Sequence, residues 1–259
     1  MEDFGISGRS LGKRRRSLLL RACSGAAIVA ALASAGCSSS SSGKPAASAS
    51  NQSAALVDVE DRLEDATTLI RQFNGKLPEA VTKEARCIMV IPSMMKGGLV
   101  LGARYGEGFA VCRASEGDAA NQHWSAPAPI LVSGGSAGFQ FGIESVDLLM
   151  LVESDSGMKK LLSSKFEVGA DVSAAAGPVG RGRQVGTDPT LKSEVYAYTR
   201  SRGLFAGAEL SGAVVKQDRD ATAALYRQSE DFRTLLSKQA TPDVDASRRF
   251  VAAVRDVMR

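Results

Sequence analysis

The 259-residue chain contains the stretch Ala174-Ala175-Ala176-Gly177-Pro178-Val179-Gly180-Arg181-Gly182-Arg183, in which glycine and arginine are mixed with small apolar residues. It lies between two segments, residues 166–173 and 204–210, whose apolar and polar residues alternate as they do in β-strands. A flexible linker would be rich in serine and other polar residues, which this stretch is not. Glycine flanked by alanine and valine instead predicts backbone packed closely against other backbone or against a ligand, where no Cβ atom fits.

Working outward, helices are predicted on either side of a long run of strands. Apolar residues at 56, 59, 63, 66, 70 and 73 form one helical stripe, Pro78 begins a shorter helix, and helices return from Asp218 to the C-terminus. A turn joins two strands at residues 105–108, and further strands are predicted at 87–91, 99–103, 109–113, 130–132, 139–143, 146–152, 166–173, 194–199 and 204–210. This order predicts an α+β fold: a single domain with a mostly antiparallel, glycine-rich β-sheet or partial barrel, flanked by N-terminal and C-terminal helices.

Residues 1–36 have the features of a lipoprotein signal peptide. Lys13-Arg14-Arg15-Arg16 supplies the basic segment, and residues 22–33 form an apolar stretch of 12 residues, too short to span a bilayer. The small residues Ser34-Ala35-Gly36 precede Cys37, whose thiol is predicted to carry the lipid. An ordinary signal peptide that leaves Cys37 unmodified is the alternative, and the basic segment suits both the general and the twin-arginine export route.

The remaining chain divides into two parts. Residues 37–53 are predicted to be the lipidated cysteine and a flexible Ser/Ala tether, and residues 54–259 the folded domain with its C-terminal helices. Anchor and tether would hold the domain at a membrane of the bacterial cell envelope. Ser38, directly after the cysteine, favours the outer membrane, with the domain facing the periplasm or the cell surface.

Removal of the signal peptide changes the charge of the chain. Residues 1–36 hold six of the 32 basic residues and two of the 28 acidic ones, so that 26 of each remain. A neutral chain lacks the electrostatic footprint of a nucleic-acid-binding protein. The glycine-rich segments fit neither the P-loop nor the dinucleotide-binding pattern, so neither nucleic acid nor nucleotide is expected as a partner.

One motif suggests catalysis, and its surroundings argue against it. Gly134-Gly135-Ser136-Ala137-Gly138 fits the G-x-S-x-G nucleophile elbow, in which a helix follows the serine and the catalytic histidine comes later in the chain. Here the single histidine, His123, precedes Ser136, and residues 139–143 have the pattern of a strand. A glycine-rich turn is therefore expected, and the protein is predicted not to be an enzyme. One histidine also leaves too few ligands for a zinc site, so neither metal nor cofactor is expected.

Cys87 and Cys112 are the remaining cysteines after Cys37, and both lie in predicted strands. In an exported protein they either form a disulfide, which would contribute about 3 kcal/mol to stability, or stay buried as free thiols. Both alternatives are open, because pairing geometry does not follow from the sequence.

Residues 55–227 contain a series of short motifs: Ile91-Pro92, Lys96-Gly97-Gly98, Arg104-Tyr105-Gly106-Glu107-Gly108, Trp124-Ser125-Ala126-Pro127, Gly134-Gly135-Ser136, Lys165-Phe166, Gly169-Ala170-Asp171, residues 174–183, Tyr196-Ala197-Tyr198 and residues 201–207. In these motifs and in their order the chain resembles the SYLF domain, a lipid-binding module. In the family the domain is associated with phosphoinositide binding and, in some eukaryotic members, with actin. The resemblance implies lipid binding in general for this chain.

Basic residues around the glycine-rich stretch are the candidates for that role. Residues 159–183 carry a net charge of +3, although the chain without its signal peptide is neutral overall. Arginine side chains and the backbone N–H groups of a glycine-rich turn both suit phosphate oxygens. Headgroup binding is therefore assigned to Lys159, Lys160, Arg181 and Arg183, and more weakly to Lys96.

Two alternatives bear on this assignment. The basic residues could instead pair with the acidic helix 56–73, and the apolar stripe of that helix could lie on a membrane. The acidic first half of the helix has the wrong sign for an anionic surface, which favours packing of the stripe in the core.

The sequence thus predicts a membrane-anchored envelope lipoprotein whose SYLF-like domain binds membrane phospholipids through a basic glycine-rich loop. The alternative function is a structural or protein-interaction module of the envelope, without a specific lipid ligand and with an unidentified protein partner.

Overall fold

The computed structural model describes residues 46–98, 101–113, 123–137, 142–163, 165–177, 194–201, 204–207, 210–237 and 242–259. Residues 43–259 form a compact unit of their own. Its elements are α1 (Ala46–Gln72), α2 (Glu79–Glu84), β1 (Cys87–Gly98), β2 (Leu101–Cys112), β3 (Ala128–Ala137), β4 (Gly142–Val152), α3 (Asp155–Leu161), β5 (Lys165–Glu167), β6 (Ala174–Ala176), β7 (Val195–Ser201), β8 (Leu204–Gly207), β9 (Ala213–Gln217), α4 (Arg219–Tyr226), α5 (Phe232–Ser237) and α6 (Asp245–Val257).

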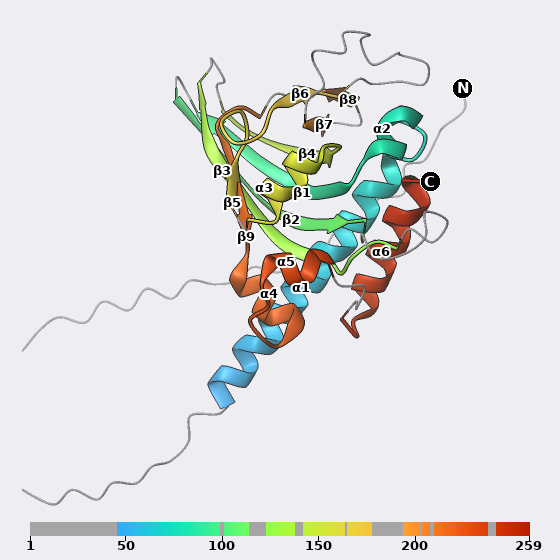
Figure 1. Cartoon of the computed structure of the whole chain (residues 1–259). Helices are drawn as coiled ribbons and strands as arrows, with labels where there is room; N and C mark the ends of the chain where they lie inside the picture. Colours follow the sequence, from blue (N-terminus) through green and yellow to red (C-terminus); the bar gives the residue numbers. More distant parts are fainter. Residues whose placement is uncertain are drawn as a thin grey trace, which may run out of the picture. The chain divides into compact units, whose positions relative to one another are not determined.

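The described strands form one nine-stranded sheet in the order β5-β9-β3-β2-β1-β4-β7-β6, with β8 also paired to β7. The sheet curls, and helices from both ends of the chain lie against it (Figure 1). Among the described strands β6 and β7 pair in parallel, and the other pairs are antiparallel. The prediction of an α+β domain with a mostly antiparallel sheet is confirmed.

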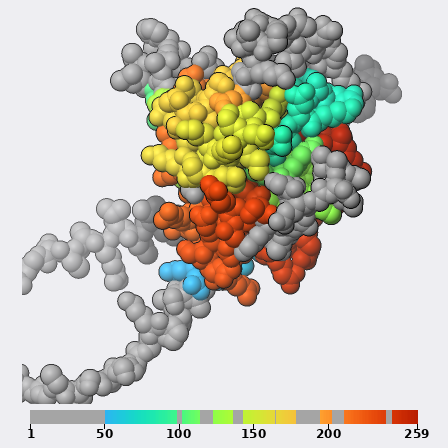
Figure 2. Space-filling model, in the orientation of Figure 1, coloured from blue at the N-terminus to red at the C-terminus, as the bar shows by residue number. Residues whose placement is uncertain are grey.

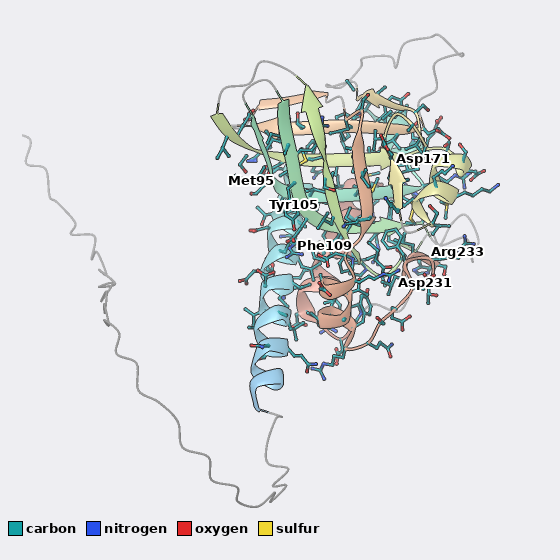
Figure 3. The ribbon with its side chains drawn as sticks, turned by 90° about the vertical axis from the view of Figure 1, so that its left-hand side faces the viewer. Met95, Tyr105, Phe109, Asp171, Asp231 and Arg233 are labelled. Atoms are coloured by element: carbon teal, nitrogen blue, oxygen red, sulfur yellow. A yellow bond between two sulfur atoms is a disulfide. The ribbon has the colours of Figure 1, made fainter. Side chains whose placement is uncertain are left out.

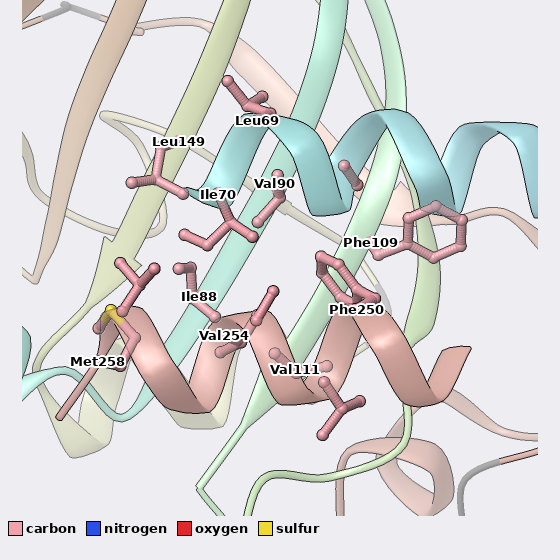
Figure 4. Packing of buried hydrophobic residues seen from close by; sticks show 14 of the residues in the cluster. Leu69, Ile70, Ile88, Val90, Phe109, Val111, Leu149, Phe250, Val254 and Met258 are labelled. Atoms are coloured by element: carbon pink, nitrogen blue, oxygen red, sulfur yellow. The ribbon is translucent and has the colours of Figure 1, made fainter. Parts of the chain in front are cut away.

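The sheet is buried on both faces over much of its length. Ile88 and Val90 of β1 belong to a cluster with α1 and α6, whereas Met89 belongs to a second cluster with α3 and α5. Figure 4 shows the first cluster, in which the rings of Phe109 and Phe250 lie 5.8 Å apart between their centroids. Because successive side chains of a strand enter opposite cores, residues 87–91 and 146–152 are nearly continuous apolar runs.

Helix α1 settles the interpretation of the apolar stripe. Val59, Leu63, Ile70 and Phe73 are at most 2% exposed, packed with the sheet and α6. Core packing of the stripe is confirmed, and its placement on a membrane surface is wrong. The helix also begins at Ala46, so residues 46–53 are helical and not a flexible tether. Alanine has the highest helix propensity, and adding residues to an existing helix avoids the unfavourable nucleation step.

Strand β1 does not stop at Pro92. It continues to Gly98, with a shift in its register against β2 between Val90 and Met95. A bulge tolerates proline, because the missing N–H is not needed in the ladder there. Ser93 has φ 52°, and its N–H donates to Asp147 Oδ1 at 3.1 Å.

The turn predicted at residues 105–108 is wrong, because these residues lie inside β2. A Cβ on Gly108 would lie 2.1 Å from the backbone oxygen of Val90, and one on Gly106 would lie 2.7 Å from Ile91 Cγ2. Close approach of β1, and not a turn, requires glycine at these positions. The glycine-rich turn predicted at residues 134–138 is likewise wrong for residues 134–137, which belong to strand β3; residue 138 lies outside the described residues.

Two other segments differ from the prediction. Residues 166–173 are not one strand: β5 ends at Glu167, and residues 169–171 form a turn in which Gly169 has φ 92°. Strand β9, between β5 and β3, was not predicted.

Candidate functional site

Four lysines gather where β5 and β9 form one edge of the sheet. Lys159 and Lys160 lie in the last turn of α3, which contacts β5; Lys165 lies on β5 and Lys216 on β9. All four lysines are exposed to solvent. We call Lys159, Lys160, Lys165 and Lys216 the lysine edge.

Helix α3 holds the first two lysines outward. The Ser154 hydroxyl accepts a hydrogen bond from Gly157 N at 2.9 Å and caps the helix, and Gly157 and Leu161 face the protein interior. Lys159 and Lys160 occupy the outer face, and their charges complement the C-terminal end of the helix dipole.

Lys160 has one carboxylate neighbour. Its Nζ lies 3.6 Å from Asp171 Oδ1, and the other oxygen of Asp171 accepts a hydrogen bond from Glu167 N at 2.8 Å. That backbone hydrogen bond, followed by the charge of Lys160, lowers the pKa of Asp171. Asp171 thus stays ionised and offsets part of the positive charge at this end of the lysine edge.

Lys165 and Lys216 form the most unusual part of the site. They are directly opposite each other in the antiparallel β5–β9 pair, so both side chains project from the same face. Like charges in this arrangement are destabilising unless something lies between them. Neither ammonium group has an ion-pair partner among the described residues. The pair is therefore suited to share an anion.

An open groove of about 560 Å³ adjoins this pair, lined by Leu131, Ser163, Lys165, Lys216, Gln217, Asp218, Arg219 and Asp220. Its lining residues come mainly from the α3–β5 and β9–α4 segments, which are coloured yellow and orange in Figure 2. Asp218 is occupied in the fold: it accepts a hydrogen bond from Ala221 N at 3.0 Å and lies 3.7 Å from Arg62. Asp220 is an exposed carboxylate that also lines the groove, together with the cations of Arg219, Lys165 and Lys216.

Two acidic residues of α1 pair with arginines. Asp58 lies 2.8 Å from Arg62, and Glu64 is paired with Arg249 of α6. The sequence left open that the basic residues of 159–183 pair with this helix. Among the described residues no ion pair joins Lys159, Lys160 or Lys165 to α1, and Lys160 pairs with Asp171.

Lys96 is not brought to the lysine edge. It lies on β1, and β2 and β3 separate that strand from β9. Lys96 pairs with Arg104 of β2, and Arg104 pairs with Gly134 of β3. Lys216 of β9 pairs instead with Leu131 of β3. Positions 131 and 134 point to opposite faces of a strand, so Lys96 and Lys216 face different sides of the sheet. Arg181, Arg183 and Cys37 lie outside the described residues.

The described start of the glycine-rich stretch packs closely, as its composition suggests. A Cβ on Gly177 would lie 2.2 Å from Tyr198 Cζ, so glycine is needed for the chain to pass over this ring. Burial raises the pKa of Tyr198.

The remaining candidates have structural positions. Cys87 and Cys112 are joined in a disulfide between directly opposed, fully buried residues of β1 and β2. Ser136 lies opposite Gly102 within the ladder of β2 and β3, and His123 is exposed. No group of three or more His, Cys, Asp or Glu residues in the described part of the chain is placed to hold a metal ion. Across the same described residues, no helix has the length and hydropathy needed to cross a membrane.

A second surface has a different character. Met95, Tyr105 and Ile143 are 45%, 48% and 78% exposed. Met95 is directly opposite Tyr105, and Ile143 is diagonal to Met95 because it pairs with Gly97. We call Met95, Tyr105 and Ile143 the sheet-end patch. In Figure 3, Met95 and Tyr105 lie on the part of the sheet that extends above α1.

Tyr105 is the polar member of this patch. Its hydroxyl donates to Glu107 Oε1 at 2.5 Å, and Glu107 Oε2 lies 2.5 Å from Arg62 Nη2. The hydrogen bond to Glu107, with smaller effects of burial and nearby charge, raises the pKa of Tyr105 to about 12.

Comparisons with known proteins place the chain. Residues 133–257 match the family model described as Ysc84, Las17-binding protein actin regulator. An SH3 domain-containing protein of Schizosaccharomyces pombe is 31% identical over 166 residues, covering 63% of this chain and 37% of that protein. Protein YSC84 of Saccharomyces cerevisiae is 30% identical over 164 residues, covering 62% and 34%. The human SH3 domain-containing YSC84-like protein 1 is 28% identical over 181 residues, covering 66% and 51%. The chain spans between about a third and a half of the length of these relatives.

Proposed function

Because residues 133–257 match the model of the Ysc84 family, the family of the SYLF domain, we propose that the folded unit of residues 43–259 binds the anionic headgroups of membrane phospholipids at the lysine edge. The observation that carries the proposal is the opposed pair Lys165 and Lys216 above a groove of about 560 Å³. Two ammonium groups held side by side, with Arg219 also lining the groove, are suited to receive one phosphate between them. Arg181 and Arg183, which follow β6 in the chain, stay in the proposal on sequence grounds.

Electrostatic attraction is large enough to matter for such a surface. A basic side chain close to an anionic leaflet contributes roughly 1 kcal/mol, so the lysine edge would supply about 4 kcal/mol at low salt. Asp171 and Asp220 reduce this value. Binding should weaken as salt is added, because the groups are exposed and screened.

The proposal includes the membrane anchor. Lipidation at Cys37 would hold the domain at the bacterial cell envelope, at the outer membrane by the identity of Ser38, and would raise the local concentration of headgroups. Mass spectrometry of the N-terminal peptide from a membrane fraction tests this part. A mature chain with an unmodified Cys37, or one retaining residues 1–36, contradicts it.

The lysine edge is tested with residues 43–259, which keep both buried clusters intact. Wild-type protein and the double variant Lys165→Glu with Lys216→Glu are sedimented with vesicles of phosphatidylcholine and phosphatidylglycerol. We expect at least about thirtyfold weaker binding for the variant, because two contacts of about 1 kcal/mol each are lost.

A matched control separates the site from net charge. Lys76→Glu with Lys83→Glu makes the same charge change at exposed positions, one before α2 and one within it. If this control loses as much affinity as the lysine-edge variant, only total charge matters and the proposed site is wrong. Failure of the wild-type domain to bind any anionic vesicle contradicts the lipid function itself.

Binding of a protein partner is the second candidate function. The family description and the name LAS seventeen-binding protein 3, a Saccharomyces cerevisiae relative 30% identical over 169 residues, refer to a protein ligand. In this chain the exposed apolar sheet-end patch is the feature that favours it. This alternative predicts that an envelope protein is pulled down with the wild-type domain. The double variant Met95→Ser with Ile143→Ser should no longer bind that protein, and its binding to vesicles should be unchanged.

A further inference from the structure

We infer that the sheet-end patch is a second membrane-contact surface, which enters the interfacial region of a lipid bilayer. The inference rests on the proposed membrane function but concerns a different part of the molecule. The patch lies on β1, β2 and β4, whereas the lysine edge lies on α3, β5 and β9.

Exposed apolar side chains are concentrated at this place. Among the described residues, the large hydrophobic side chains that are exposed are those of Val57, Met95, Tyr105 and Ile143. Val57 lies on α1, and the other three adjoin one another at the ends of neighbouring strands. Single exposed apolar residues are ordinary, but a contiguous group marks an interaction surface.

The residues between them make the surface protrude. Ala103 is opposite Gly97, and Gly97 is opposite Ile143, so two very small residues share the face with the patch. The side chains of Met95 and Ile143 therefore stand above a nearly bare backbone surface. The side chains of Met95 and Ile143 can therefore enter a bilayer interface without first losing contacts with neighbouring side chains on the sheet.

The opposite face of the same strand ends is polar and contains cations. Lys96 is directly opposite Arg104 on one side and Glu144 on the other. Arg104 Nη2 donates to Gly135 O at 3.1 Å, and Glu144 accepts a hydrogen bond from Ser201 at 3.0 Å. Lys96, Arg104 and Glu144 together carry a net charge of +1, which complements anionic headgroups.

This two-faced arrangement favours a lipid over a protein as the occupant. A protein that covered the patch would meet one face of the sheet and leave the cationic face in solvent. A bilayer interface receives both faces together, because apolar groups enter the acyl boundary while cations stay among the phosphates. Tyrosine, with an apolar ring and a hydroxyl, is enriched at that depth. Lys96, assigned to headgroup binding from the sequence, would act here and not at the lysine edge.

A single fluorescent probe tests the inference. In residues 43–259 the cysteines are Cys87 and Cys112, which are joined in the disulfide, so Ile143→Cys provides one free thiol. Labelled with an environment-sensitive fluorophore and mixed with phosphatidylcholine and phosphatidylglycerol vesicles, the protein should show blue-shifted emission. Nitroxide-labelled lipids should quench that emission.

Val57→Cys is the matched control, because Val57 is 56% exposed on α1, away from the patch. We expect its label to remain in water and unquenched. Quenching at position 57 without quenching at position 143 overturns the inference and assigns the contact to α1. Shielding of the label at position 143 by a second protein molecule in the absence of lipid also overturns it.

The outcomes separate this inference from the lysine edge. Vesicle binding without quenching at position 143 leaves the lysine edge standing and removes the patch from the membrane. Quenching at position 143 that persists in the Lys165→Glu, Lys216→Glu background supports the patch and contradicts the lysine edge. If the labelled Ile143→Cys protein with Lys165 and Lys216 intact binds no vesicles, the membrane roles of the sheet-end patch and of the lysine edge are both contradicted.

Discussion

The two ends of strand β1 have opposite environments. Cys87, Ile88, Met89, Val90 and Ile91 are fully buried, with one core on each face of the strand. Beyond the bulge, Met95 is 45% exposed, and residues 96–98 are partly exposed. The same strands are therefore covered by a hydrophobic core on both faces at one end and exposed to solvent at the other.

The bulge is what separates these environments without breaking the strand. Asp147 of β4 accepts a hydrogen bond from Ser93 N and pairs with Arg200 of β7 at 2.6 Å. These contacts hold the exposed end in register with its neighbours although little is packed upon it. The comparison teaches that stability is concentrated at the Cys87 end and that the Gly98 end is available for binding.

The largest expected difference between the two ends is in side-chain truncation. Phe109 and Tyr105 lie on the same strand and face, but Phe109 is fully buried against Phe250 and Tyr105 is 48% exposed. Phe109→Ala should reduce the free energy of unfolding by about 4 kcal/mol, and Tyr105→Ala by less than about 1 kcal/mol. Urea denaturation followed by circular dichroism measures both. Equal losses would mean that the exposed end is packed in solution and would remove the contrast.

The disulfide should make the next largest contribution. Cys87 and Cys112 are 25 positions apart, and opening a loop of that size costs about 3 kcal/mol. Cys87→Ala with Cys112→Ala should therefore lower the urea midpoint strongly, while vesicle binding by the folded fraction stays unchanged. Reduced binding at full folding would show that the buried end also shapes the binding surface.

A smaller contrast is expected between two glycines. Gly108→Ala places a methyl group 2.1 Å from Val90 O, whereas at Gly135 the nearest contact is Gly102 O at 3.9 Å. The first substitution should cost about 2 kcal/mol through overpacking, and the second should change the unfolding free energy by less than about 0.5 kcal/mol. Thermal unfolding of the two variants compares them directly. A neutral Gly108→Ala would mean that β1 can move away from β2 at the bulge.

The fold was predictable where the pattern reports burial. The stripe from Val59 to Phe73 and the apolar run of residues 87–91 indicate buried elements, because periodicity follows from which faces are covered. The glycines of β2 and β3 led to a wrong prediction of turns. The sequence does not distinguish a glycine required by a closely packed neighbouring strand from one required by a turn. Strand β9 has only five residues, and its place beside β5 depends on pairing with distant strands.

The candidate site was predictable only in part, for the same reason. Lys159, Lys160 and Lys165 are close in the sequence, and the charges of Lys160 and Lys165 both act on Asp171 in the structure. Lys216 and Arg219 join them through the β5–β9 pairing, and nothing local in the sequence signals that contact. Lys96 was grouped with the others by charge, but its strand places it on the other face of the sheet.

The smallest expected effect is the titration of Tyr105 at the exposed end. Its pKa of about 12 lies above the ordinary value of 10, because its hydroxyl donates to Glu107. The folded state thus holds this proton more tightly than the unfolded state does, and the resulting stabilisation is complete below pH 10 and lost as the pH rises from 10 to 12.

Glu107→Gln removes the carboxylate and should move the Tyr105 pKa back toward 10, as measured by the ultraviolet absorbance of tyrosinate. Subtracting the titration of Tyr105→Phe isolates this residue, and burial keeps the pKa values of Tyr198 and Tyr226 still higher. An unchanged midpoint in Glu107→Gln would show that the hydroxyl points into solvent. The ring would then be free to turn with the lipid interface and not fixed to the sheet.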